Sequence, residues 1–158
     1  MKLVTYLTPD EARRAGAAVG DGIVDLAAGA AALGVTLPSD VTGILRMGDA
    51  GLATARQVIA AAESGRLPTW PAASVRLTAA VPNPPKLLLL AGNYQAHIVE
   101  GGALPVEKAR ITPRPFIKPG TAVVGTGDPI IIPPDTDTLD YEIEIAAVIG
   151  RRGRFIPV

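Results

Sequence analysis

The sequence predicts an α+β protein with mainly β structure, and three observations support this class. Its 158 residues include 17 Gly and 15 Pro, which favour turns and short strands. Gly20-Asp21-Gly22 separates two short apolar stretches, as in a β-hairpin. The clearest helical repeat of apolar positions is confined to residues 50–64. A hydrophobic fraction of 48% with 19% charged residues is typical of a packed globular chain.

The first 81 residues are expected to form a small α+β domain. Its predicted strands are residues 2–7, 14–19, 23–26 and 74–81. Its predicted helices are residues 27–33, ended by Gly34, a brief helix from a cap at Ser39 or Asp40 to Met47, and 50–64, ended by Gly65. We assign no chemistry to this domain, because it has no histidine and no close carboxylate pair on a plausible common face.

Residues 82–158 are expected to form a second domain, starting at the break Pro82-Asn83-Pro84-Pro85. Residues 86–91 lack polar alternation and predict a strand buried on both faces. A helical turn is expected next, then a mobile loop, then a series of short strands. These segments are residues 95–100 for the turn, 101–114 for the loop, and 116–119, 123–124, 130–132, 139–150 and 154–158 for the extended pieces.

The predicted strand 139–150 carries two carboxylates on one face. Side chains alternate along a strand, so Glu142 and Glu144 point the same way, about 6–7 Å apart at the backbone. Like charges in a buried strand are costly unless a cation pairs with them, and Mg²⁺, Mn²⁺ and Ca²⁺ prefer oxygen ligands. The pattern fits a metal site, and it equally fits an edge strand with both glutamates in water.

His97, the only histidine, stands three residues before Glu100. On a helical turn the two share a face, and a carboxylate beside an imidazole suits a general acid–base pair. A surface histidine in an ordinary turn contact is the alternative. Lys118, between Ile117 and Pro119, could neutralise a substrate carboxylate or simply extend its ammonium group into water.

Composition excludes several classes of protein. Lys+Arg and Asp+Glu number 15 each, so no charge excess favours nucleic acid or an anionic membrane. The absence of cysteine excludes thiolate metal sites and a cysteine nucleophile, and it fits a cytoplasmic location. The longest intense apolar run, residues 87–91, is far shorter than the roughly 20 residues that span a bilayer. No membrane or nucleic-acid partner is therefore expected.

From Pro82 onward the chain resembles the fumarylacetoacetate hydrolase superfamily. The matching pieces, in order, are Pro82-Asn83-Pro84-Pro85-Lys86, Gly92-Asn93-Tyr94-x-x-His97-x-x-Glu100, Pro115-Phe116-x-Lys118-Pro119, Ile132-Pro133 and Asp140-Tyr141-Glu142-x-Glu144-x-Ala146-x-Val148-Ile149-Gly150. Each piece alone is weak, but the order and spacing match jointly. The first 81 residues look like the small N-terminal domain of bacterial members, through Arg14-x-Gly16-x-x-Val19, Asp21-Gly22 and Val24-Asp25-Leu26.

The resemblance implies a mixed β-sandwich roll, of which residues 82–158 would be the first part, and a homodimer. It implies a divalent-metal enzyme, with Mg²⁺ (or Mn²⁺ or Ca²⁺), acting on 2-oxo acids or acylpyruvate-like substrates. The reaction would be C–C hydrolysis, isomerisation or decarboxylation through a metal-stabilised enolate. Its residues would be His97 and Glu100 for acid–base catalysis, Glu142 and Glu144 for the metal, and Lys118, Asn93 and Tyr94 for substrate.

The family's third metal ligand, an aspartate, is expected beyond Val158, so the chain is expected to be a fragment of a longer protein. The alternative is a truncated or degenerate relative that serves as a non-catalytic binding or assembly module. Binding of Mg²⁺ together with oxalate would separate the two.

Overall fold

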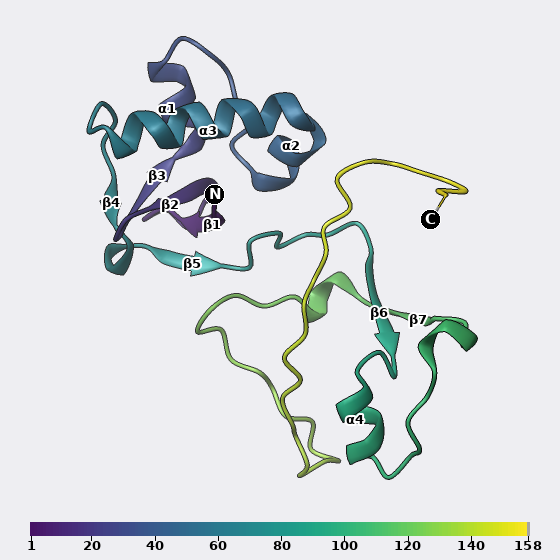
Figure 1. The fold of residues 1–158 in the computed structure, drawn as a ribbon. Coiled ribbons are helices and arrows are strands. Elements are labelled where there is room, and N and C mark those ends of the chain that lie inside the picture. Colours follow the sequence, from purple (N-terminus) through teal and green to yellow (C-terminus); the bar gives the residue numbers. More distant parts are fainter. Residues whose placement is uncertain (158) are drawn as a thin grey trace. The chain divides into compact units, whose positions relative to one another are not determined.

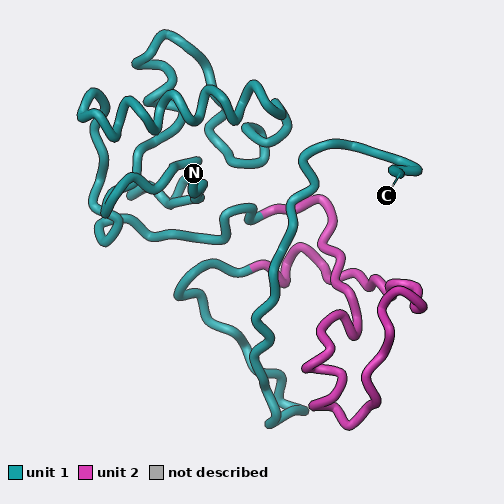
Figure 2. The backbone as a smooth tube through the Cα atoms, viewed as in Figure 1, with its two compact units in different colours: residues 1–82, 124–158 teal, residues 83–123 magenta. Residues whose placement is uncertain are grey.

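The computed structural model describes residues 1–157, which fall into two compact units (Figures 1 and 2). The first unit comprises residues 1–82 and the chain from residue 124 onward, coloured teal in Figure 2. The second comprises residues 83–123, coloured magenta. Both helices and antiparallel strands are present, as the α+β class predicts; the sandwich roll stays a prediction.

The first unit is built on a five-stranded antiparallel sheet with the strand order β4-β3-β2-β1-β5. Its strands are β1 (Leu3–Leu7), β2 (Arg13–Val19), β3 (Gly22–Asp25), β4 (Trp70–Pro71) and β5 (Arg76–Thr78). The predicted hairpin is confirmed, with Val19 opposite Gly22 and Gly20 at a φ of +53°. A positive φ at the first loop position is what a type II′ turn requires, and glycine provides it without strain.

Three α-helices pack with this sheet: α1 (Leu26–Ala32), α2 (Val41–Arg46) and α3 (Asp49–Glu63). Asp40 caps α2, accepting a 2.8 Å hydrogen bond from the amide of Gly43, so the predicted cap is confirmed. A 3₁₀ turn, η1 (Ala72–Ser74), follows β4. Helix α1 lies close to α3, since a Cβ added at Gly29 would come within 2.5 Å of Val58 Cγ1.

The core of the first unit lies between the helices and the central strands. Its largest fully buried side chains are those of Leu26, Ile44, Val24 and Val58. The same cluster includes Ala15 and Ala17 from β2 and Ala55, Ile59 and Ala62 from α3. The apolar stripe predicted for residues 50–64 is therefore the buried face of α3.

The second unit is a two-stranded antiparallel sheet with one short helix. Strands β6 (Leu87–Ala91) and β7 (Arg114–Lys118) pair from Leu87 opposite Lys118 to Ala91 opposite Arg114. Helix α4 (Gln95–Glu100) follows β6, and the 3₁₀ turns η2 (Lys108–Arg110) and η3 (Gly120–Ala122) flank β7. The strand and the helical turn were predicted.

The expectation that residues 86–91 are buried on both faces is wrong for this structure. Leu88 is 58% exposed and Leu90 is 43% exposed. A continuous apolar run indicates only that both faces of a strand are suited to burial. A two-stranded sheet by itself provides no packed layers to bury those faces.

The strands predicted at 123–124, 130–132, 139–150 and 154–158 are also wrong for the residues described. Residues 123–150 contain turns and irregular backbone, as do residues 151–157, while Val158 lies outside the described part. A β-strand needs a partner for its amide and carbonyl groups, and residues 1–157 provide no strand paired with these segments. Because no strand pairs with this segment, Ile143 and Ile145 are 89% and 90% exposed despite their apolar alternation.

Candidate active site

His97 and Glu100 lie together on α4, in the second unit. The Nδ1 atom of His97 is 3.8 Å from Oε2 of Glu100, an ion-pair distance when the imidazole is protonated. The i,i+3 spacing on a helical turn brings them together, as predicted. Both side chains are exposed, at 61% and 82%. The pair is thus exposed at the surface of the second unit.

The segment that joins β6 to α4 holds two further predicted residues. Gly92 has a φ of +64°, which turns the chain out of the strand. Asn93 is half-buried, and Tyr94 is the N-cap residue of α4 with a 40% exposed side chain. Both residues therefore lie beside the helix that carries His97.

Lys118 occupies the other end of the two-stranded sheet. It pairs with Leu87, whereas α4 follows the end at which Ala91 pairs with Arg114. Four residue steps along a strand correspond to about 13 Å. The backbone therefore does not bring Lys118 to the end of the strand from which α4 starts.

Glu142 and Glu144 lie in an irregular, exposed part of the first unit rather than on a strand. Nearby, the amide of Tyr141 donates a 2.8 Å hydrogen bond to Oδ1 of Asp140. Two carboxylates are suitable donors for a hard cation, but a metal site with protein ligands usually needs more. Residues 1–157 contain no group of three His, Cys, Asp or Glu side chains placed to hold a metal ion. The glutamates are at most a partial ligand set here.

A buried polar network in the first unit was not predicted. Asp25 is 4% exposed and accepts from four groups. The donors are Tyr6 Oη at 2.6 Å, Arg14 Nε at 2.5 Å, Arg14 Nη2 at 3.1 Å and the Ala28 amide at 2.7 Å. Asp25 is also the N-cap residue of α1, so one carboxylate links β1, β2 and a helix N-terminus.

The network shifts the pKa values of its members. Burial and the Asp25 carboxylate raise the pKa of Tyr6 to about 12. Burial alone would raise the pKa of Asp25, but hydrogen bonds from Arg14, Ala28 and Tyr6 outweigh it, and the pKa is lowered. The hydrogen bond to Asp25 raises the pKa of Arg14. Asp25 is therefore ionised and fully paired, which is a structural role.

The sequence held a partial signal for this network. Tyr6 and Arg14 are cross-strand neighbours in the first hairpin of the sheet, and Asp25 is opposite Gly16. Once the register is known, the three side chains are near one another. The register itself could not be fixed from the apolar pattern of residues 2–19.

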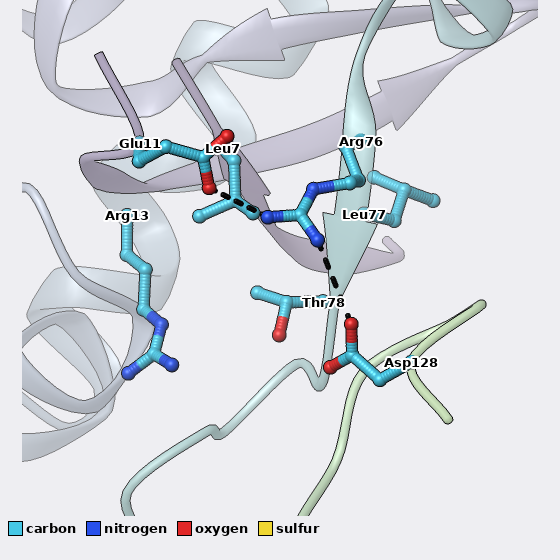
Figure 3. Close-up of a pocket in the computed structure, with 7 residues that line it drawn as sticks. All are labelled: Leu7, Glu11, Arg13, Arg76, Leu77, Thr78 and Asp128. Atoms are coloured by element: carbon cyan, nitrogen blue, oxygen red, sulfur yellow. Dashed lines mark hydrogen bonds and ion pairs between the residues drawn. The ribbon is translucent and has the colours of Figure 1, made fainter. Parts of the chain in front are cut away.

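The first unit has two hollows, and the network lines the larger of them. The larger, about 610 Å³, is lined by Tyr6, Arg14, Asp25 and Trp70 among others. The smaller, about 400 Å³, is shown in Figure 3. There Arg76 lies between two carboxylates, with Nη2 2.6 Å from Glu11 Oε2 and Nη1 3.6 Å from Asp128 Oδ1. Arg76 is thus paired with both carboxylates, and neither hollow is lined by a residue predicted to act in catalysis.

Residues 86–158 match the model of the fumarylacetoacetate (FAA) hydrolase C-terminal domain. This segment contains His97 and Glu100 in the second unit, and Glu142 and Glu144 in the first. Through it, the chain belongs to the fumarylacetoacetate hydrolase superfamily.

Several relatives are named oxaloacetate tautomerases. The chain is 36% identical over 137 residues to the mitochondrial oxaloacetate tautomerase FAHD2A of Bos taurus, covering 87% of this chain and 40% of that protein. It is 33% identical over 161 residues to the mitochondrial Fahd2a of Rattus norvegicus, covering 99% and 47%. An uncharacterised protein of Pyrococcus horikoshii is 38% identical over 74 residues, covering 47% and 30%. The chain thus spans less than half the length of these relatives.

Among residues 1–157, no helix has both the length and the apolar character needed to cross a membrane.

Proposed function

We propose that the protein is an enzyme that moves a proton on a 2-oxo acid, interconverting its keto and enol forms. The observation that carries this proposal is the His97–Glu100 pair, 3.8 Å apart on a helix inside the segment that matches the family. The names of the mammalian relatives support oxaloacetate as the first substrate to test. Hydrolysis or decarboxylation at the neighbouring C–C bond would use the same enol chemistry.

The two members of the acid–base pair have different roles. Neutral His97 accepts the proton from the carbon next to the carbonyl and becomes an imidazolium ion. Glu100 stabilises that positive charge and holds the ring orientation through Nδ1. His97 then gives the proton to the substrate oxygen, which completes the keto–enol exchange without a net change in the enzyme.

We further propose Glu142 and Glu144 as ligand positions for Mg²⁺, with Mn²⁺ or Ca²⁺ as substitutes. Their support is the chemistry of the donor set, since carboxylate oxygens suit hard cations. Mg²⁺ held by these two carboxylates would supply positive charge that stabilises the negative charge developing on the enol oxygen of the substrate. Asn93, Tyr94 and Lys118 are proposed to contact the substrate.

Turnover of oxaloacetate tests the acid–base pair. Loss of the enol form is followed by ultraviolet absorbance in the presence of Mg²⁺. We expect His97→Asn to lower kcat by about 10²–10⁴-fold and Glu100→Gln to lower it less. Glu107→Gln is the matched control, because Glu107 is also exposed and also pairs at i,i+3, with Arg110 at 3.6 Å. Full activity of His97→Asn would contradict the assignment.

Calorimetric titration with Mg²⁺ and oxalate tests the metal positions and the alternative of a non-catalytic module. Oxalate resembles the enol form of pyruvate, so a metal enzyme of this kind should bind the two together. Glu142→Ala and Glu144→Ala are expected to weaken this binding, while Asp135→Ala, in the preceding turn, is expected to leave it unchanged. No heat of binding with the unmodified protein would favour the module.

A further inference from the structure

Helix α4 is too short to hold its own position. It has six residues, none of them buried, and isolated helices need roughly 12–15 residues to be even marginally stable in water. Its N-cap position is occupied by tyrosine rather than by a short polar residue of the kind that caps helices. Contacts from outside the helix must therefore orient the face that carries His97 and Glu100.

The C-terminal end of α4 is held by its own turn. The Gly102 amide donates to the Val99 carbonyl at 2.9 Å, and the Ala103 amide donates to the Ile98 carbonyl at 3.2 Å. With Gly102 at a φ of +80°, this is a Schellman motif. The motif ends the helix but leaves its first turn unfixed.

The first turn is held by the side chain of Gln95. Its Nε2 group donates to the carbonyl of Val106, and its Oε1 atom accepts from the amide of Val106 at 3.2 Å. The carboxamide thus pairs with both backbone groups of one residue, as a neighbouring strand would. Within residues 101–114, Val106 is half-buried and the other residues are exposed. Gln95 is likewise half-buried.

The spacing around the helix separates this contact from the acid–base pair. Each residue advances by about 100°, so His97 lies about 200° from Gln95. Ile98, three residues after Gln95, shares its face and is half-buried. Gln95 can therefore fix the helix from one side while His97 and Glu100 stay open on another.

We propose that Gln95 is a positioning residue for the acid–base pair. Its carboxamide ties Val106 to the first turn of α4, closes the intervening loop, and thereby sets the direction in which His97 points. The role in catalysis rests on the proposed function above, but the contact with Val106 does not. A small error in the placement of a reacting group can lower a rate by about 10²-fold.

Hydrogen exchange of the Val106 amide tests the contact, and enzyme kinetics test its use. In Gln95→Ala we expect the Val106 amide to exchange at least fivefold faster, and kcat on oxaloacetate to fall 10- to 100-fold with KM changed less than threefold. Gln57→Ala is the control, because Gln57 is the other glutamine and lies exposed on α3. Unchanged Val106 exchange in Gln95→Ala would overturn the proposal.

Gln95→Glu gives a test that a merely structural role would not pass. A carboxylate keeps the acceptor for the Val106 amide but loses the donor, and protonation restores a donor. The ratio of kcat in this variant to kcat in the unmodified protein should therefore rise as pH falls from about 7 to about 4.5. A ratio that is flat with pH would contradict positioning by the donor. If the unmodified protein turns over no 2-oxo acid, the proposed function fails, and Val106 exchange still decides the contact.

Discussion

Residues 1–82 and residues 129–157 are similarly rich in apolar side chains, yet only the first region buries them. Ile44 is 0% exposed, whereas Ile143 is 89% exposed. In the first region each strand has a paired neighbour, and the helices cover the central strands. In the second, no strand forms within the described residues. Burial of an apolar segment therefore depends on neighbouring strands and helices that pack against it. The apolar pattern predicts only which side chains would be buried by such neighbours.

The largest expected difference between the two regions is in the free energy of unfolding when one isoleucine in each is replaced by alanine. Ile44→Ala removes a fully buried side chain and should lower the free energy of unfolding by about 2–5 kcal/mol. Ile143→Ala should change it by no more than about 0.5 kcal/mol. Urea unfolding followed by Trp70 fluorescence measures both, since Trp70 is the only tryptophan and lies in the first unit. Equal losses would show that residue 143 is packed.

Asp25→Asn tests the buried network and should be nearly as costly. Removing one partner of a buried ion pair typically costs about 3–5 kcal/mol, and we expect about 3 because Arg14 remains 34% exposed. Asp40→Asn is the matched control, since Asp40 also caps a helix but lies near the surface. Its cost should stay near zero, because asparagine caps about as well as aspartate. If Asp25→Asn lowers the free energy of unfolding no more than Asp40→Asn does, the network does not stabilise the fold.

Acid should reproduce part of the Asp25→Asn effect. The pKa of Asp25 is lowered in the folded protein, so its stabilisation is present above the unfolded-state pKa near 4 and is lost as pH falls through the folded value. The unmodified protein and Asp25→Asn should therefore converge in stability at low pH.

Local signals in the sequence predicted the local structure of the first region well. The hairpin at Gly20-Asp21, the cap at Asp40 and the stop of α3 at Gly65 each depend on residues a few positions apart. The pair His97–Glu100 was predicted for the same reason, because three residues on a helical turn fix its geometry. Such features need no knowledge of the rest of the fold.

Features that depend on distant partners were missed or wrong. The Tyr6–Arg14–Asp25 network needs the register of two hairpins, which apolar alternation does not fix. The strand predicted for 139–150 needs neighbouring strands that residues 1–157 do not supply. The contact of Gln95 with Val106 joins residues 11 positions apart, across a loop after α4 whose path no periodicity describes.

The smallest effect we expect is a loss of stability at alkaline pH. Tyr6 in the first region should contribute to this loss, and Tyr141 in the second should not. The pKa of Tyr6 is raised to about 12 by burial and by Asp25, whereas an unfolded tyrosine ionises near 10. The neutral ring therefore stabilises the fold below pH 10, and this contribution is lost as pH rises from about 10 toward 12. Tyr6→Phe should flatten that alkaline loss, for which a shift from 10 to about 12 sets an upper bound of about 2.7 kcal/mol. Tyr141→Phe is the matched control, because Tyr141 is 82% exposed and irregular in backbone. An identical alkaline slope in Tyr6→Phe and the unmodified protein would mean that Asp25 is held by Arg14 and the Ala28 amide, without the phenol.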